Sequence, residues 1–168
     1  NNPANWQAHY QTTAEEIWRQ TRGTITHFVA GLGTTGTFIG TTRRLKELNP
    51  LLCAVAVQPD APLHGLEGLK HLASALVPGI YDPAVPDETS YVSTEAAYDA
   101  IQRLVAQEGF LVGPSSGAAL AAGLQLAKHL SFSSTDRPAT IVMVFPDSGN
   151  RYAAEGLLAE PADRSLSS

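Results

Sequence analysis

Apolar runs of strand length, each followed by small turn-forming residues and then by a helix-like segment, constrain the fold of this chain most. Residues 25–30 are β-branched and apolar, and residues 51–57 are almost continuously apolar. Runs of this kind are typical of strands in a parallel sheet that is covered on both faces. The strand–helix alternation recurs about four times, which predicts an α/β fold: a parallel sheet with flanking helices in three layers and right-handed crossovers.

Capping and turn residues set the expected element boundaries. Thr12 and Glu15 have the spacing of a capping box that opens a short helix ending at Gly23. Ser93 or Thr94 would cap a helix that ends at Gly109. We expect the other helices at 37–48 and 118–130 and a short one after 149, and the strands at 25–30, 51–57, 110–112 and 140–145. Residues 63–76 are expected to be partly helical, and residues 77–90 to be an irregular crossing segment.

Length and composition exclude several classes of protein. The 168 residues suffice for one core, expected over residues 1–158, with a polar tail at 159–168. The net charge of -5 and the lack of a long basic cluster argue against a nucleic-acid partner. No stretch approaches the roughly 20 apolar residues of a membrane span. Cys53 is the only cysteine, which excludes an internal disulfide and is compatible with the cytoplasm. The first residue is not Met, so we expect the chain to be part of a longer protein.

The first glycine-rich turn, residues 31–36, matches the pattern G-x-G-x-x-G between a strand and a helix. Glycines let the backbone approach a phosphate, and the amino end of a helix offers free N–H groups to it. One interpretation is a dinucleotide-binding Rossmann domain with Asp60 as its acidic partner, and another is a tight turn without a ligand. The hydroxyls of Thr34, Thr35 and Thr37 favour a phosphate site, because core packing does not require them.

The second turn, residues 113–117, matches the nucleophile elbow G-x-S-x-G. A hydrolase on that fold needs an acid and then a histidine after the serine. No histidine follows Asp147, and no acid lies between Ser115 and His129, so we exclude a serine hydrolase. Ser115 is then either a ligand-binding hydroxyl or a plain helix N-cap. The turn at Asp147 is expected to cap a helix and to line the same pocket at most.

The segment 64–68 follows the second strand and contains a histidine and a glutamate three residues apart. A third ligand is not visible in the sequence, so His64 and Glu67 do not predict a metal site. The glycines at 65 and 68 instead indicate a hinged segment beside the pocket.

Together these motifs are similar to those of the β-replacing pyridoxal-phosphate (PLP) enzymes of fold type II, and they most resemble cysteine synthase, also called O-acetylserine sulfhydrylase. The resemblance follows the chain in order to about residue 158, through residues 2–5, 12–18, 31–40, 55–59, 109–119 and 146–152. It implies the large C-terminal domain of that fold, with PLP as cofactor. The phosphate loop of the family, Gly-Thr-Gly-Gly-Thr, falls on Gly33, Thr34, Thr35, Gly36 and Thr37, with threonine at its third position.

The resemblance also implies roles for other residues and a reaction. Ser115 would meet the pyridine nitrogen of PLP, and Gly65 would lie near the substrate. The implied reaction is β-replacement on O-acetylserine or O-phosphoserine by a sulfur nucleophile, in a cytoplasmic homodimer that takes an amino-acid substrate. Within the family, cystathionine β-synthase and serine/threonine dehydratase remain alternatives.

The lysine that forms the Schiff base with PLP in this family lies in a Ser-x-Lys context upstream of the phosphate loop. The lysines here are Lys46, Lys70 and Lys128, which we interpret as surface residues. We therefore expect no catalytic residue in this chain, little activity from the segment alone, and exposed apolar surface where the missing part would pack. A non-catalytic or regulatory remnant is the alternative.

Overall fold

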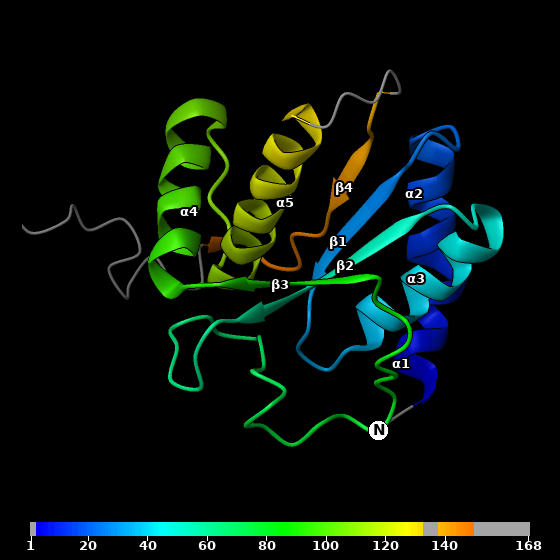
Figure 1. Ribbon diagram of the computed structural model, residues 1–168, viewed down its shortest axis with the longest axis horizontal. Coiled ribbons are helices and arrows are strands. Elements are labelled where there is room, and N and C mark those ends of the chain that lie inside the picture. The colour runs from blue at the N-terminus through cyan, green and yellow to red at the C-terminus, as the bar shows by residue number, and fades with distance from the viewer. Residues whose placement is uncertain (1–2, 133–137, 150–168) are drawn as a thin grey trace, which may run out of the picture.

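Four parallel strands form the central sheet of this computed structural model, which describes residues 3–132 and 138–149 (Figure 1). The strand order is β3-β2-β1-β4, and each neighbouring pair is parallel. The strands are β1 (His27–Gly31), β2 (Cys53–Pro59), β3 (Glu88–Val92) and β4 (Ile141–Met143). The predicted α/β class is confirmed.

Helices cover both faces of the sheet and complete the three layers. On one face α3 (Gly36–Leu48) packs against the N-terminal helical segment, and on the other lie α4 (Thr94–Glu108) and α5 (Pro114–Phe132) (Figure 1). Neighbouring residues of β1 serve opposite layers: Phe28 joins the core on the α3 side, and Val29 joins the core on the α5 side. This arrangement accounts for the continuous apolar character of the central strands, because both faces are buried.

The N-terminal helix begins earlier than the sequence predicted. It runs without interruption through α1 (Pro3–Ala8), the π-helical turn η1 (His9–Thr13) and α2 (Ala14–Gln20). The predicted capping box at Thr12 is wrong, because this residue lies inside the helix and its hydroxyl donates to the carbonyl of Ala8 at 2.8 Å. The helix starts at Pro3, and proline favours the first turn of a helix, which explains the earlier start. The predicted end is confirmed by Gly23, at a φ of +72°.

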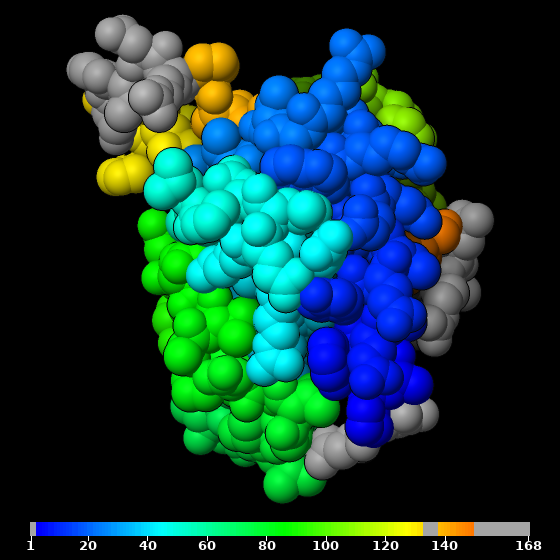
Figure 2. Space-filling view, turned by 90° about the vertical axis from the view of Figure 1, so that its right-hand side faces the viewer, coloured from blue at the N-terminus to red at the C-terminus, as the bar shows by residue number. Residues whose placement is uncertain are grey.

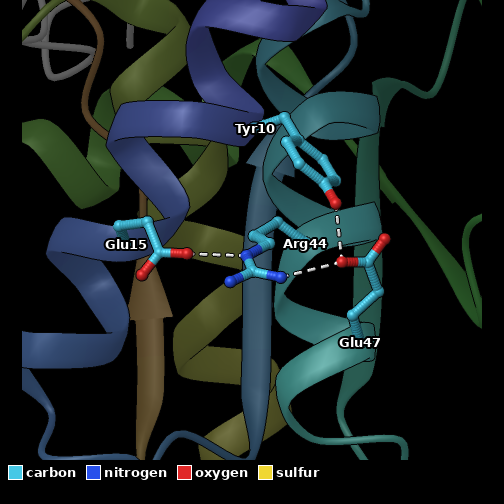
Figure 3. Close-up of polar contacts among 4 residues, drawn as sticks. All are labelled: Tyr10, Glu15, Arg44 and Glu47. Carbon is cyan, nitrogen blue, oxygen red and sulfur yellow. Dashed lines mark hydrogen bonds and ion pairs between the residues drawn. The ribbon is translucent and has the colours of Figure 1, made fainter.

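This N-terminal helix packs along α3 through a group of polar contacts (Figure 3). The Nε atom of Arg44 donates to Glu15 Oε1 at 2.6 Å, and its Nη1 atom donates to Glu47 Oε2 at 2.9 Å. The hydroxyl of Tyr10 donates to the same Glu47 oxygen at 2.6 Å. Figure 2 shows residues 3–20, in blue, running along this face beside the cyan surface around the end of α3.

The prediction for α4 is confirmed in detail. The Ser93 hydroxyl accepts the N–H of Ala96 at 3.1 Å, and Gly109 ends the helix with a φ of +74°. α5 was predicted to start after a turn at 113–117, but it already begins at Pro114. Proline is well suited to the first position of a helix, which places Ser115 inside the first turn.

Three other predictions are wrong. Residues 63–76 form turns and no helix, and Glu88–Val92 is the edge strand β3 although 77–90 was expected to be irregular. The predicted strand at 110–112 is reduced to an isolated antiparallel bridge between Val112 and Ser148. The strand β3 was missed because its residues are mostly polar and exposed, and an edge strand does not need an apolar run. The helix expected after 149 lies outside the described residues. Within residues 3–132 and 138–149, no helix is long and apolar enough to cross a membrane.

Candidate functional site

The strand order creates a crevice at the carboxyl ends of β1 and β4. From β1 the chain moves outward to β2 and β3 on one side, and it returns to pair β4 on the other side of β1. Ligands of open α/β sheets bind where the connections leave in opposite directions. A cavity of about 360 Å³ lies at this point, and its wall includes Gly33, Thr34, Thr35, Thr37, Gly68, Ser115 and Asp147. The loops after two strands and the amino ends of two helices therefore meet at one cavity.

A larger hollow of about 690 Å³ lies elsewhere, between the N-terminal helix and α3. Trp6, Tyr10 and Arg43 are among its lining residues, and the strand ends do not reach it. Because it lacks both the glycine-rich turns and a helix amino end, we take the smaller cavity as the candidate site.

The turn after β1 is shaped for close approach to a ligand. A side chain at Gly33 would collide with the carbonyl oxygen of Gly68 across the cavity wall. Thr35 is the residue before α3 and has a φ of +68°, in the left-handed region that a β-branched residue rarely adopts. The turn therefore holds a strained conformation that places the amino end of α3 at the cavity.

Thr35 also carries an unsatisfied hydroxyl. The residue is 2% exposed, and its Oγ1 atom has no hydrogen-bond partner among the described residues. Leaving a buried hydroxyl unpaired costs about 1–3 kcal/mol. An anionic group bound at the amino end of α3 would accept this hydrogen bond. The cavity therefore fits a phosphate on a structural observation that is independent of the sequence motif.

Thr37 connects the cavity to the N-terminal helix. Its Oγ1 atom lies 3.1 Å from Nε2 of His9, and Nδ1 of the same ring lies 2.9 Å from Oγ1 of Thr13. Burial lowers the pKa of His9, which favours the neutral ring. His9 was not identified from the sequence, and the π-helical turn that contains it is the kind of irregularity that often marks functional sites.

The opposite wall is the amino end of α5. Ser115 is 6% exposed, and its hydroxyl lies 3.4 Å from Oδ1 of Asp147. The interpretation of Ser115 as an N-cap is wrong, because α5 begins one residue earlier. The structure thus brings Ser115 and the threonine loop to one cavity, as their places at two strand ends suggested.

The segment 64–68 forms part of the wall through Gly68, which has a φ of +85°. Gly65 lies farther along, where its N–H donates to Oγ1 of Thr94 at 3.0 Å. Its placement near the substrate stays a prediction. The Nδ1 atom of His64 accepts the N–H of Leu66 at 3.2 Å. Among the described residues, no cluster of three or more His, Cys, Asp and Glu side chains could hold a metal ion.

None of the chain's three lysines lines this cavity. Lys46 pairs with Asp87 at 2.8 Å, and Lys128 lies near the exposed end of α5. Lys70 lines a separate hollow that it shares with Thr34.

Comparisons with known proteins assign this arrangement to a family. Residues 1–147 match the family model described as pyridoxal-phosphate dependent enzyme. This chain belongs to that family. The match sets aside the interpretation of the chain as a Rossmann domain with Asp60 as its acidic residue. It confirms the resemblance that the loop motifs indicated.

Within the pyridoxal-phosphate dependent family, the similar curated proteins are cysteine synthases. The cysteine synthase of Aquifex aeolicus is 50% identical over 160 residues, which are 95% of this chain and 48% of that protein. Cysteine synthase B of Pseudomonas aeruginosa is 39% identical over 93% of this chain and 50% of its own length. The chain therefore spans about half the length of these relatives.

Solved structures of the family agree. O-acetylserine sulfhydrylase isoform 3 from Entamoeba histolytica has a TM-score of 0.86 at 34% identity, covering 97% of this chain and 49% of that one. O-ureido-L-serine synthase has a TM-score of 0.83 at 35% identity, covering 97% of this chain and 53% of that one. The neighbours are fold type II enzymes, as the sequence predicted.

Proposed function

We propose that this segment forms the cofactor-binding part of a PLP enzyme that makes cysteine. The full-length protein would replace the leaving group of O-acetylserine or O-phosphoserine with a sulfur nucleophile. One observation carries the proposal: in a chain of this family, a glycine–threonine turn and a buried serine face one cavity from the amino ends of two helices. When bound, PLP supplies an electron-withdrawing ring that stabilises negative charge developing on the substrate.

The phosphate of PLP would be held at the amino end of α3. The N–H groups of this first turn have no partner within the helix, and the helix dipole favours an anion there. The hydroxyls of Thr34, Thr35 and Thr37 add donors, and Gly33 lies in the cavity wall beside them. Gly36 does not line the cavity; its missing side chain makes room for that of Asn5. In this arrangement the buried Thr35 hydroxyl gains the acceptor that it otherwise lacks.

The ring of PLP would lie across the cavity, with its nitrogen at Ser115. A neutral hydroxyl does not hold the ring positive as a direct carboxylate would, which suits departure of a leaving group from the β carbon. We assign the lysine that attaches PLP to the remainder of the full-length protein, because none of the three lysines here lines the cavity. We further place that protein in the cytoplasm as a homodimer.

The decisive experiment uses the full-length protein loaded with PLP. Each donor, O-acetylserine and O-phosphoserine, is incubated with sulfide, and cysteine is quantified. We expect cysteine from one or both donors, and at least a tenfold weaker affinity for PLP in Thr35→Ala, whose hydroxyl is gone. Absence of PLP binding to the full-length protein would overturn the proposal.

Further assay arms separate the family alternatives. Cystathionine from serine and homocysteine would indicate cystathionine β-synthase, and a 2-oxo acid from serine or threonine alone would indicate a dehydratase. For the isolated segment, we expect no visible absorption band of a Schiff base between PLP and a lysine, and no PLP attached to a lysine after borohydride reduction. PLP found attached to Lys46, Lys70 or Lys128 after the reduction would contradict our assignment of the PLP-attaching lysine to the rest of the protein.

A further inference from the structure

Three hydrogen-bonded side chains link the N-terminal helix to the wall of the candidate site. The ring of His9 lies between two hydroxyls, with Nδ1 2.9 Å from Oγ1 of Thr13 and Nε2 3.1 Å from Oγ1 of Thr37. Thr37 lines the cavity, whereas His9 and Thr13 do not. His9 can therefore influence a ligand in the cavity only through the hydroxyl of Thr37.

Close packing of two helices holds this ring in place. A Cβ atom at Gly40 of α3 would collide with the backbone carbonyl of Trp6, and it would lie 3.1 Å from Cβ of His9. The missing side chain thus lets the N-terminal helix approach α3 closely. The π-helical turn η1 contains both His9 and Thr13. The ring is consequently fixed against the first turn of α3, where Thr37 is the second residue.

The described wall of the cavity contains no cationic side chain for an anionic ligand. Its charged side chains are those of Glu67 and Asp147, and both are acidic. Asp147 lies against the hydroxyl of Ser115 on the opposite wall, and Glu67 belongs to the segment 64–68. Negative charges in the wall oppose the ionisation of a phosphate held there. A phosphate therefore depends on well-directed donors, which are the N–H groups of the first turn of α3 and the threonine hydroxyls.

The Thr37 hydroxyl has a single proton, and His9 determines where it points. Burial lowers the pKa of His9, which favours a neutral ring with one proton. With that proton on Nε2, the ring accepts from Thr13 and donates to Thr37, whose own proton is then free for the cavity. With the proton on Nδ1, Thr37 would donate to the ring and turn a lone pair toward the anion. A bound phosphate therefore selects the first arrangement.

We propose that His9 is a positioning residue that directs the Thr37 proton at the phosphate of PLP and so keeps this phosphate fully ionised. This inference rests on the proposed function, which places the phosphate at the amino end of α3. A phosphate oxygen that carried a proton would meet the proton of Thr37, and the two would repel. Protonation of His9 in acid does not cancel the effect, because Nε2 still donates to Thr37.

The test records the ionisation of the phosphate by ³¹P NMR. Full-length protein loaded with PLP is titrated from about pH 8 to about pH 5.5, a range that spans the ionisation of free phosphate monoesters near pH 6. We expect the wild-type phosphorus chemical shift to stay constant over this range. In His9→Phe, whose ring cannot donate, we expect the shift to move with pH toward that of a monoanion. A wild-type shift that titrates as in free PLP would overturn the proposal.

Two variants of the same helical turn separate the His9 donor from the packing of the helix. His9→Gln keeps an amide N–H that can donate to Thr37, so most of the constant shift should return. Tyr10→Phe removes the hydroxyl that donates to Glu47 at 2.6 Å and leaves His9 in place, so its shift should stay constant. A pH-dependent shift in Tyr10→Phe would show that docking of the helix, and not the His9 donor, controls the phosphate.

Thr13→Val keeps the proposal testable if His9→Phe does not fold. It removes the hydroxyl that holds the tautomer of His9, so the shift should move with pH in the same direction by a smaller amount. A constant shift in Thr13→Val would contradict the hydrogen-bond chain. In Thr37→Val, the further change His9→Phe should add little, and an undiminished effect would also contradict it. Failure of the wild type to bind PLP would instead overturn the proposed function.

Discussion

The Nε2 atom of His9 lies 3.1 Å from the hydroxyl oxygen of Thr37, so a helix at the start of the chain reaches the wall of the candidate site. Nδ1 of His9 lies 2.9 Å from the Thr13 hydroxyl. A neutral ring with its proton on Nε2 accepts from Thr13 and donates to Thr37. Thr37 then has its own proton available for a phosphate in the cavity.

The first prediction concerns His9→Phe in the full-length protein. The substitution removes both hydrogen bonds and leaves the Thr37 hydroxyl without a fixed direction. A typical hydrogen bond contributes about 0.5–1.5 kcal/mol, so we expect PLP to bind about 2- to 12-fold more weakly in a fluorescence titration. The matched control is His27→Phe. His27 is a half-buried histidine at the start of β1, away from the cavity, and its ring is hydrogen-bonded to Thr26. Equal weakening in both variants would contradict the role of His9.

The second prediction concerns acid. Burial lowers the pKa values of His9 and His27, the latter against a smaller raising effect of Glu88. The unfolded chain, with histidine pKa values near 6.5, then binds more protons than the folded one as the pH falls through that value. Stability should therefore decrease from about pH 7 toward the lower folded pKa values. Urea denaturation midpoints at neutral and mildly acidic pH should differ less in a His9→Gln, His27→Gln double variant. An unchanged difference would contradict this assignment.

The third prediction concerns the left-handed conformation of Thr35. Glycine adopts a φ of +68° without the penalty of about 1–2 kcal/mol that a side chain incurs, but it adds about 0.4–1 kcal/mol of unfolded-state entropy. We expect Thr35→Gly to be more stable than Thr35→Ala by about 0.5–1 kcal/mol in urea unfolding. Both variants lack the hydroxyl, so both should bind PLP more weakly than the wild type. Greater stability of the alanine variant would show that the backbone conformation is not strained.

The fourth prediction concerns the contacts between the N-terminal helix and α3 (Figure 3). The hydrogen bond to Glu47 raises the pKa of Tyr10, while Arg44 partly opposes the effect. In Glu47→Gln, an ultraviolet titration should show one tyrosine ionising at lower pH than in the wild type. Glu15→Gln removes the other carboxylate bound to Arg44 but leaves the Tyr10 acceptor in place, so the Tyr10 titration should stay close to wild type. If both variants behaved alike, the Glu47 hydrogen bond would not be the cause.

The buried layers of this fold could be predicted from the sequence. β1 and β2 are apolar on both faces, and α3 and α4 end at glycine or asparagine signals that local chemistry explains. The edge strand β3 was missed because its exposed polar residues resemble a loop. The start of the N-terminal helix was missed because an internal Ser/Thr-x-x-Glu pattern resembles a cap.

The site was predictable in its motifs and not in its connections. The threonine turn follows β1, whereas the second turn follows residues 110–112, which were expected to be a strand and form only an isolated bridge. The rule that parallel strands share a carboxyl edge still predicted that the two turns meet. The contact between His9 and Thr37 depends on how two helices pack, which no local pattern encodes. The pairing of Asp147 with Ser115 depends on the turn after β4, and the sequence offered only a helix cap with a secondary role in the pocket.

The pairing of β4 with β1 also sets the order of events during synthesis. Thr26 and Thr140 are hydrogen-bonded across a separation of 114 residues, and the cavity wall that contains Asp147 follows β4 directly. A chain growing from the ribosome can form β1, α3 and β2 early, since their contacts are close in sequence. One edge of β1 then stays open until β4 has emerged. A nascent chain stalled before β4 would carry the threonine turn but would lack the wall that contains Asp147, so this cavity cannot form before β4 has emerged.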